Sequence, residues 1–132
     1  MDKDSTSIEQ ARTRWFIDLD WYQQNNRSFS ALAKACLCPE CHERLAGKAV
    51  SAEELLAVIR DCCSKKPGFI TPKMPILGSV FRLLLANGNQ PLNWEELEGQ
   101  LREWRGQACA SAEALSRLLS SDQYYGLRQV PD

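Results

Sequence analysis

The sequence predicts a mainly helical α+β protein: an N-terminal helical segment that bears cysteines, then three helices and a short strand. Three observations lead to this prediction. Apolar residues recur at steps of three and four along most of the chain, which is typical of helices that bury one face. The segment Cys38-Pro39-Glu40-Cys41 has the C-x2-C spacing of a metal knuckle. Aromatic and β-branched residues gather at 124–130, where they suit a short strand.

The chain divides at a connector rich in turn-forming residues. Pro67, Gly68 and Pro72 fall within residues 65–73, between two stretches of helical periodicity. The first ten residues are polar and acidic, so we expect a flexible tail there. The expected parts are residues 1–10 as the tail, 11–72 as a helical segment with the metal knuckle, and 73–132 as a second domain.

Capping residues mark the helices of the first half. Ser28 can cap a short helix, and Ser51 with Glu54 forms an S-x-x-E capping box. The aromatic-rich segment 15–22 lacks clean alternation, so it is a short buried helix or an extended segment that enters a helix. The helices expected in this half begin near Asp18, Ser28 and Ser51 and end near Asn25, Ala35 and Cys63.

The second half shows three helical stripes with cap residues. Pro75 suits a first helical position and Gly88 a left-handed C-terminal cap. Asn93 opens the next helix and Gly106 closes it. The expected helices run over about 75–87, 93–105 and 111–121, and the strand lies within 124–130 with a bend at Gly126. The residues expected to point inward are Ile76, Leu77, Val80, Phe81, Leu84, Leu85, Trp94, Leu97, Leu101, Trp104, Ala112, Leu115, Leu118 and Leu119.

Three helices followed by a strand resemble the winged-helix (helix-turn-helix-like) domains over about residues 73–132. The resemblance rests on the order of elements and on no residue signature. It implies that the third helix enters the DNA major groove and that the short β wing touches the backbone. The residues it implies for nucleic-acid binding are Ser116, Arg117 and Ser120 beside Glu113 on the third helix and Arg128 at the wing. Separately from the resemblance, Lys65, Lys66 and Lys73 can add positive charge to this surface. Segments 17–22, 62–66 and 122–128 also resemble a small bacterial family, from which no activity is carried over.

The charge balance limits how strongly the chain can bind a nucleic acid. Sixteen basic residues stand against seventeen acidic ones. Within 111–130, Arg117 and Arg128 are matched by Glu113 and Asp122. Because phosphate contacts supply most nonspecific affinity, we expect weak binding to DNA or RNA, in a homodimer or a larger complex, with a regulatory role in transcription.

The cysteines predict a metal site. Cys38 and Cys41 can direct two thiolates at one tetrahedral ion, and the adjacent pair Cys62-Cys63 completes a four-thiolate zinc site. Neighbouring residues on a regular helix point about 100° apart, so both of this pair can ligate only if the helix has ended there. If only one of them ligates, His42 or Cys36 would supply the fourth group, although His42 meets the same objection beside Cys41.

Each cysteine also has a plainer explanation. Cys62 and Cys63 continue the apolar pattern of the preceding helix, so packing as small core residues is an alternative to the metal role. Cys36 is expected mainly to pack, and Cys109 to be a free thiol. An iron–sulfur cluster would use the same four thiolates, but zinc is the commoner occupant of such a knuckle.

The sequence lacks the usual machinery of an enzyme. It has one histidine, no G-x-S-x-G and no glycine-rich phosphate loop. Asp18 and Asp20 could act as a general acid–base pair, but helix capping is the stronger explanation for two carboxylates at these positions. The aromatic residues of 15–22 can stack bases, but core packing is the stronger interpretation. We therefore predict a non-enzymatic protein.

Two further functions fit the same scaffold. A protein-interaction adaptor is favoured by the neutral charge if Trp94 or Trp104 faces solvent. A thiol redox or metal sensor would use the cysteines.

The longest nearly apolar run, 80–86, falls short of the roughly 20 residues of a membrane helix. The polar first residues lack the order of a secretory signal, so we expect a cytoplasmic protein with no membrane partner.

Overall fold

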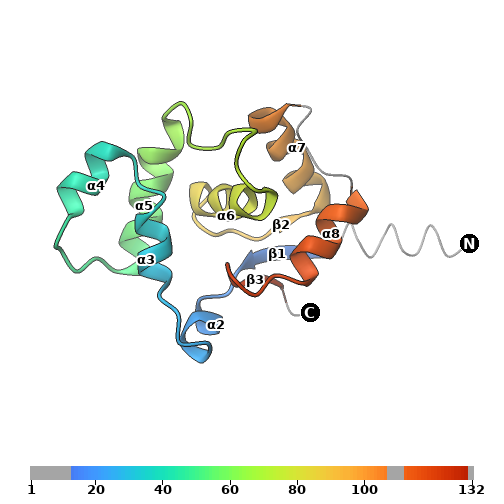
Figure 1. Ribbon diagram of the computed structural model, residues 1–132, viewed down its shortest axis with the longest axis horizontal. Coiled ribbons are helices and arrows are strands. Elements are labelled where there is room, and N and C mark those ends of the chain that lie inside the picture. The colour runs from blue at the N-terminus through green and yellow to red at the C-terminus, as the bar shows by residue number, and fades with distance from the viewer. Residues whose placement is uncertain (1–12, 107–111, 131–132) are drawn as a thin grey trace, which may run out of the picture.

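The computed structural model describes residues 13–106 and 112–130 and combines helices with one small antiparallel sheet (Figure 1). The predicted α+β class is therefore confirmed. In chain order the elements are β1 (Arg14–Ile17), α2 (Leu19–Gln24), α3 (Phe29–Lys34), α4 (Pro39–Leu45), α5 (Ala52–Asp61), the short 3-10 helix η1 (Cys63–Lys65), α6 (Ile76–Ala86), β2 (Leu92–Asn93), α7 (Trp94–Arg105), α8 (Ala112–Ser120) and β3 (Leu127–Gln129). None of the helices in the described part of the chain is long and apolar enough to cross a membrane.

The sheet joins segments from opposite ends of the chain. Its strand order is β2-β1-β3, and the central strand β1 is antiparallel to both neighbours. Trp15 pairs with Leu92 on one side and with Gln129 on the other. The side chain of Asn89 accepts a hydrogen bond from Ile17 N at 2.8 Å and donates one to Ile17 O at 2.9 Å. The helix-rich second half is thus completed by a strand from the first half.

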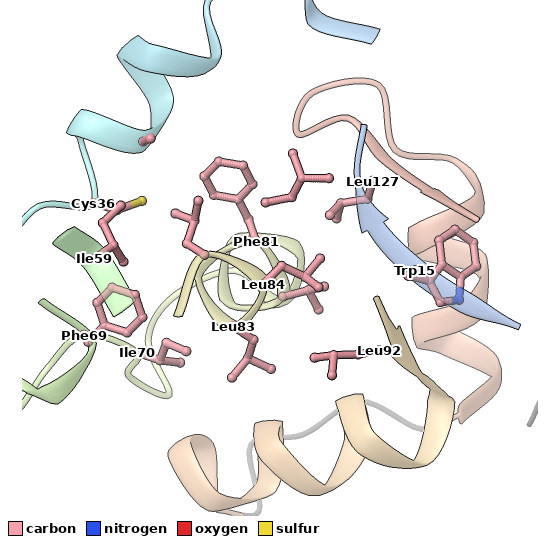
Figure 2. Packing of buried hydrophobic residues seen from close by; sticks show 14 of the residues in the cluster. Trp15, Cys36, Ile59, Phe69, Ile70, Phe81, Leu83, Leu84, Leu92 and Leu127 are labelled. Atoms are coloured by element: carbon pink, nitrogen blue, oxygen red, sulfur yellow. The ribbon is translucent and has the colours of Figure 1, made fainter. Parts of the chain in front are cut away.

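Helix α6 lies at the centre of the hydrophobic core. It packs against α5, α7, α8 and β1 (Figure 1). Phe81, Leu83 and Leu84 leave α6 in different directions, and the residues around them come from both halves of the chain (Figure 2). These surrounding residues include Cys36, Ile59, Phe69 and Ile70 on one side and Trp15, Leu92 and Leu127 on the other. The buried apolar side chains form one cluster.

The predicted helix caps are present where their side chains were expected. The side chains of Asp18, Ser28 and Ser51 accept backbone hydrogen bonds at the starts of α2, α3 and α5. Asn93 and Glu96 form a reciprocal capping box on α7. Capping is therefore the role that the structure gives Asp18.

Three local expectations need correction. Leu118 was expected to point inward but is 38% exposed, because the fully buried side of α8 follows Leu115 and Leu119, one turn apart. Pro75 caps α6 from outside instead of occupying its first turn. The strand is shorter than 124–130. The predicted start of the third helix at Ser111 lies outside the described residues, as does Cys109.

The large aromatic residues belong mostly to the core. Trp15 and Trp21 are buried, and so is Tyr22, whose hydroxyl donates to the Tyr125 carbonyl. Core packing is therefore the confirmed interpretation for these three. Trp94 and Trp104 are half-buried and pack against the core, so the exposed tryptophan that would favour an adaptor surface is not found at either position.

A buried arginine fixes the connector between the halves. Arg105, at the end of α7, donates to the carbonyl oxygens of Thr71, Pro72 and Met74 and to the hydroxyl of Ser79. It is 7% exposed. Because a guanidinium carries five donors in a fixed plane, one side chain can hold several carbonyls of an irregular segment. This contact was not predicted from the sequence.

Candidate metal centre

The start of α4 places two cysteines close together. Cys38 is the N-cap residue, and Pro39 occupies the first turn with its fixed backbone angle. Cys41 follows within the same turn and is buried. Residues three apart on a helix share a face, so the two sulfurs point toward the same region.

The end of α5 supplies the other pair. The helix ends at Asp61, and Cys62 has φ −128° and ψ −65°, outside helical geometry. Cys63 then begins η1. The break removes the helical separation of about 100° that would keep two adjacent side chains apart. Both cysteines can therefore turn toward α4, and each sulfur contacts Cys38 Sγ.

Three of the four sulfurs converge on one small region, and the sulfur of Cys63 lies against that of Cys38. The Sγ atoms of Cys38, Cys41 and Cys62 all lie within 4.8 Å of one another. Cys38 Sγ lies 3.9 Å from Cys62 Sγ and 3.4 Å from Cys63 Sγ. Four sulfurs bound tetrahedrally at about 2.3 Å from a zinc ion are about 3.8 Å apart. The cysteine cluster is close enough to hold a metal ion.

Hydrogen bonds and burial act in opposite directions on these thiols. The Cys41 backbone N–H lowers the pKa of Cys38 to about 7. Burial raises the pKa of Cys41 to about 12 and also raises the pKa of Cys63. Metal ligation requires thiolates, so a bound cation would have to supply the charge that keeps the two buried sulfurs ionised.

Donors around the cluster suit negatively charged sulfur. The Cys38 backbone N–H donates to Cys63 Sγ at 3.2 Å, and Arg44 Nη2 donates to Cys41 Sγ at 3.6 Å. Lys66 Nζ lies 3.5 Å from a carboxylate oxygen of Glu40, on the first turn of α4. Four thiolates around a divalent ion carry a net negative charge, and the two donors to sulfur offset part of it, whereas the charge of Lys66 is balanced by Glu40. Arg44 was not singled out from the sequence, since its relation to Cys41 depends on the side chain's direction.

The two alternative ligands lie apart from the group. Cys36 is buried, and its thiol donates to the Leu32 carbonyl at 3.5 Å, which agrees with its expected packing role. His42 is exposed on α4. The set of ligand atoms that all lie within 4.8 Å of one another is Cys38, Cys41 and Cys62, and Cys63 adjoins it through its 3.4 Å contact with Cys38 Sγ.

The residues expected to contact nucleic acid are spread over different elements. On α8, Arg117 and Ser120 are exposed and Ser116 is half-buried. Arg128 is half-buried on β3, and its guanidinium donates to the Asp122 carbonyl at 3.2 Å. Of the three lysines, Lys65 and Lys73 are exposed, while Lys66 faces Glu40 beside the cysteines. The structure therefore places Lys66 with the candidate metal centre.

The fold and the cluster together define a mixed α+β protein with a candidate four-cysteine metal centre. The chain matches no protein-family model, no curated protein and no solved structure in the comparisons made with them. The functional argument consequently depends on the geometry of the site.

Proposed function

We propose that the chain is a non-enzymatic binding module stabilised by one zinc ion, held by Cys38, Cys41, Cys62 and Cys63. The observation that carries the proposal is the convergence of sulfurs from the start of α4 and the end of α5. An iron–sulfur cluster of several irons would hold its cysteine sulfurs farther apart than a single ion does. Separations of 3.4 and 3.9 Å favour a single ion.

The zinc would act as a cross-link within the first half. Cys41 is the fully buried residue of α4 and Leu45 packs only partly against the core, so this helix has little apolar surface with which to hold its place. Binding four thiolates to one ion ties α4 to the end of α5, which itself packs against α6. The metal thereby connects a weakly packed helix to the core.

Metal analysis tests the proposal directly. Protein purified without added metal is expected to contain about one equivalent of zinc, and Cys38→Ser to lose both the metal and thermal stability. Cys36→Ser is the matched control, because it changes a buried thiol outside the cluster and should keep the metal. Less than about 0.2 equivalents of zinc and iron in intact, reduced protein would exclude a metal centre. One equivalent of iron would replace zinc as the ion.

A second proposal concerns the partner of this module. Helices α6, α7 and α8 are followed by β3, and β1 pairs with β3 to form an antiparallel ribbon. This arrangement supports a winged-helix-like domain whose ribbon is completed from the other end of the chain. Such a domain would contact duplex DNA through α8, where Arg117 is exposed.

Salt dependence separates this second proposal from a protein-binding role. Affinity for duplex DNA is expected to fall steeply between low and physiological salt, because phosphate contacts release counterions. Arg117→Gln should weaken binding and lower the salt slope by about one. Undetectable duplex binding at low salt, together with salt-insensitive capture of a protein partner, would favour the adaptor function instead.

A further inference from the structure

A polar hollow lies between the end of α2 and the loop that joins α8 to β3. It has a volume of about 350 Å³. We call it the arginine hollow. The residues that line it are Trp21, Asn25, Arg27, Gln123 and Arg128. The backbone N–H of Asp18 donates to the Gly126 carbonyl at 2.8 Å, which holds these distant parts of the chain together. None of these residues takes part in the candidate metal centre.

Two guanidinium groups are held at the wall of this hollow by a buried ring. Arg27 Cζ lies 5.7 Å from the centroid of the Trp21 ring, and Arg128 Cζ lies 5.6 Å from it. Trp21 is 6% exposed and therefore gives both cations a fixed surface. Arg128 is also anchored by its hydrogen bond to the Asp122 carbonyl. Both cations are thus positioned before any ligand binds, which reduces the entropy cost of binding.

Among the residues that the structure describes, no acidic side chain lines the hollow. The salt bridges found among residues 13–106 and 112–130 involve Arg60, Lys66 and Arg102, and neither arginine of the hollow. The nearby carboxylate of Asp122 is buried and accepts hydrogen bonds from the backbone N–H groups of Tyr124, Tyr125 and Leu127. The hollow is therefore suited to an anion.

The neighbouring groups narrow the class of anion. Planar guanidinium forks match the oxygens of a phosphate group in bidentate geometry. Tyr124 is 51% exposed, and Arg27 Cζ lies over its ring at 5.3 Å from the centroid, so a partly exposed aromatic ring lies beside the cations. A phosphate site next to an exposed ring is typical of proteins that stack the bases of a single strand.

A second hollow extends this surface along the sheet. It is lined by Trp15, Leu119, Ser120, Leu127, Arg128 and Gln129, so Arg128 belongs to both hollows. A shared cation between two concavities suits a chain of phosphates more than a single small anion. We propose that the arginine hollow binds a phosphate of single-stranded nucleic acid, with Arg27 and Arg128 on the phosphate and Tyr124 against a base. This goes beyond the metal centre and assigns the phosphate to Arg27 and Arg128, with no role for Arg117.

Fluorescence anisotropy with a labelled single-stranded oligothymidylate of about twelve nucleotides tests the proposal on the full, metal-loaded chain. Arg27→Gln and Arg128→Gln are each expected to raise Kd about tenfold, because each removes a charge-assisted contact. Tyr124→Leu should raise Kd about fivefold by removing the stacking face. Arg102→Gln is the matched control, since it removes the same charge from the exposed side of α7, where Arg102 pairs with Glu98. Its Kd should stay within about twofold of the parent.

Several results would overturn the proposal. Equal losses in Arg102→Gln would show that only net charge matters, and a loss confined to Arg117→Gln would assign binding to α8. Unchanged binding in Tyr124→Leu would exclude stacking of a base on Tyr124. Competition by inorganic phosphate as strong as that by unlabelled oligonucleotide would indicate a simple anion site, and equal affinity for a duplex would exclude preference for a single strand. Circular dichroism and metal content of every variant show whether the fold and metal centre persist, so failure of this site is distinguishable from failure of the metal proposal.

Discussion

Helices α4 and α6 are held in the molecule by different means. Six of the eleven residues of α6 are buried, five of them apolar, whereas Cys41 is the buried residue among the seven of α4. Each fully buried large apolar side chain contributes about 1.5–3 kcal/mol, so α6 needs no further support. In the zinc site proposed above, coordination by the sulfurs would hold α4 instead. One chain would then combine a hydrophobic core with a region held by metal coordination.

The largest effect is expected from a change at the centre of the shared core. Leu84 is fully buried on α6, and its side chain lies among residues from both halves (Figure 2). Leu84→Ala should lower the free energy of unfolding by about 3–4 kcal/mol through lost burial and the cavity left behind. Urea denaturation followed by circular dichroism measures this loss. Both halves should unfold in one transition, and two separate transitions would contradict a common core.

Metal removal should loosen α4 and leave α6 in place. Chelation is expected to raise hydrogen exchange in α4 by at least about tenfold, because its anchoring cross-link is lost. Exchange in α6 should remain slow, since apolar packing holds that helix. Mass spectrometry of peptides from the two helices measures both rates in one sample. Equal increases in α4 and α6 would show that the metal supports the whole fold, and no increase in α4 would show that sulfur coordination does not hold this helix.

A smaller loss is expected at the connector between the two halves. Arg105→Gln removes hydrogen bonds to carbonyl oxygens of residues 71, 72 and 74 and leaves them without their charged donor. We expect a loss of about 2–3 kcal/mol, measured by chemical denaturation. Arg102→Gln on the same helix is the control, because its exposed ion pair with Glu98 contributes about 0.5 kcal/mol or less. Similar losses in the two variants would argue against a special role for the buried arginine.

The local features of the fold were predictable because their causes lie within a few residues. Ser51 and Asn93 cap the helices that they were expected to cap, since capping depends on residues three positions away. The C-x2-C spacing likewise predicted that Cys38 and Cys41 would lie close together, and their sulfurs do. These signals do not depend on the rest of the fold.

Features that depend on distant contacts were not predictable. The partners of β1 come from residues 92–93 and 127–129, and the Asn89 side chain that completes its edge is 72 positions away from Ile17. Whether the side chains of Cys62 and Cys63 can point in the same direction depends on where α5 ends. The sequence did not mark that end, because the apolar pattern continues across it. The arginine hollow forms only because the pairing of β1 with β3 brings residues 21–27 close to residues 123–128. No local sequence motif predicts such a site.

A modest loss is expected where the loop after α8 approaches α2. Gly126 has φ +70°, and an added Cβ would lie 2.9 Å from Tyr22 Cε2 and 3.0 Å from Trp21 Cε3. Gly126→Ala should therefore cost about 1–2 kcal/mol in thermal or chemical unfolding. Because Trp21 supports both arginines of the hollow, Gly126→Ala should also lower the affinity for the oligonucleotide. The metal content should stay constant. A loss of metal in this variant would show that the two regions are coupled.

The smallest effect is expected at the histidine beside the cluster. His42 is exposed and lies outside the group of mutually close sulfurs, so His42→Asn should change stability by less than about 0.5 kcal/mol and leave metal content unaltered. Cys63→Ser is the informative companion, because Cys63 Sγ lies 3.4 Å from Cys38 Sγ and is the fourth ligand in the proposed site. Competition with a chromophoric chelator measures zinc affinity in both variants. A large loss in His42→Asn with none in Cys63→Ser would make the histidine the fourth ligand. The opposite result would leave α4 tied to the core by sulfur alone.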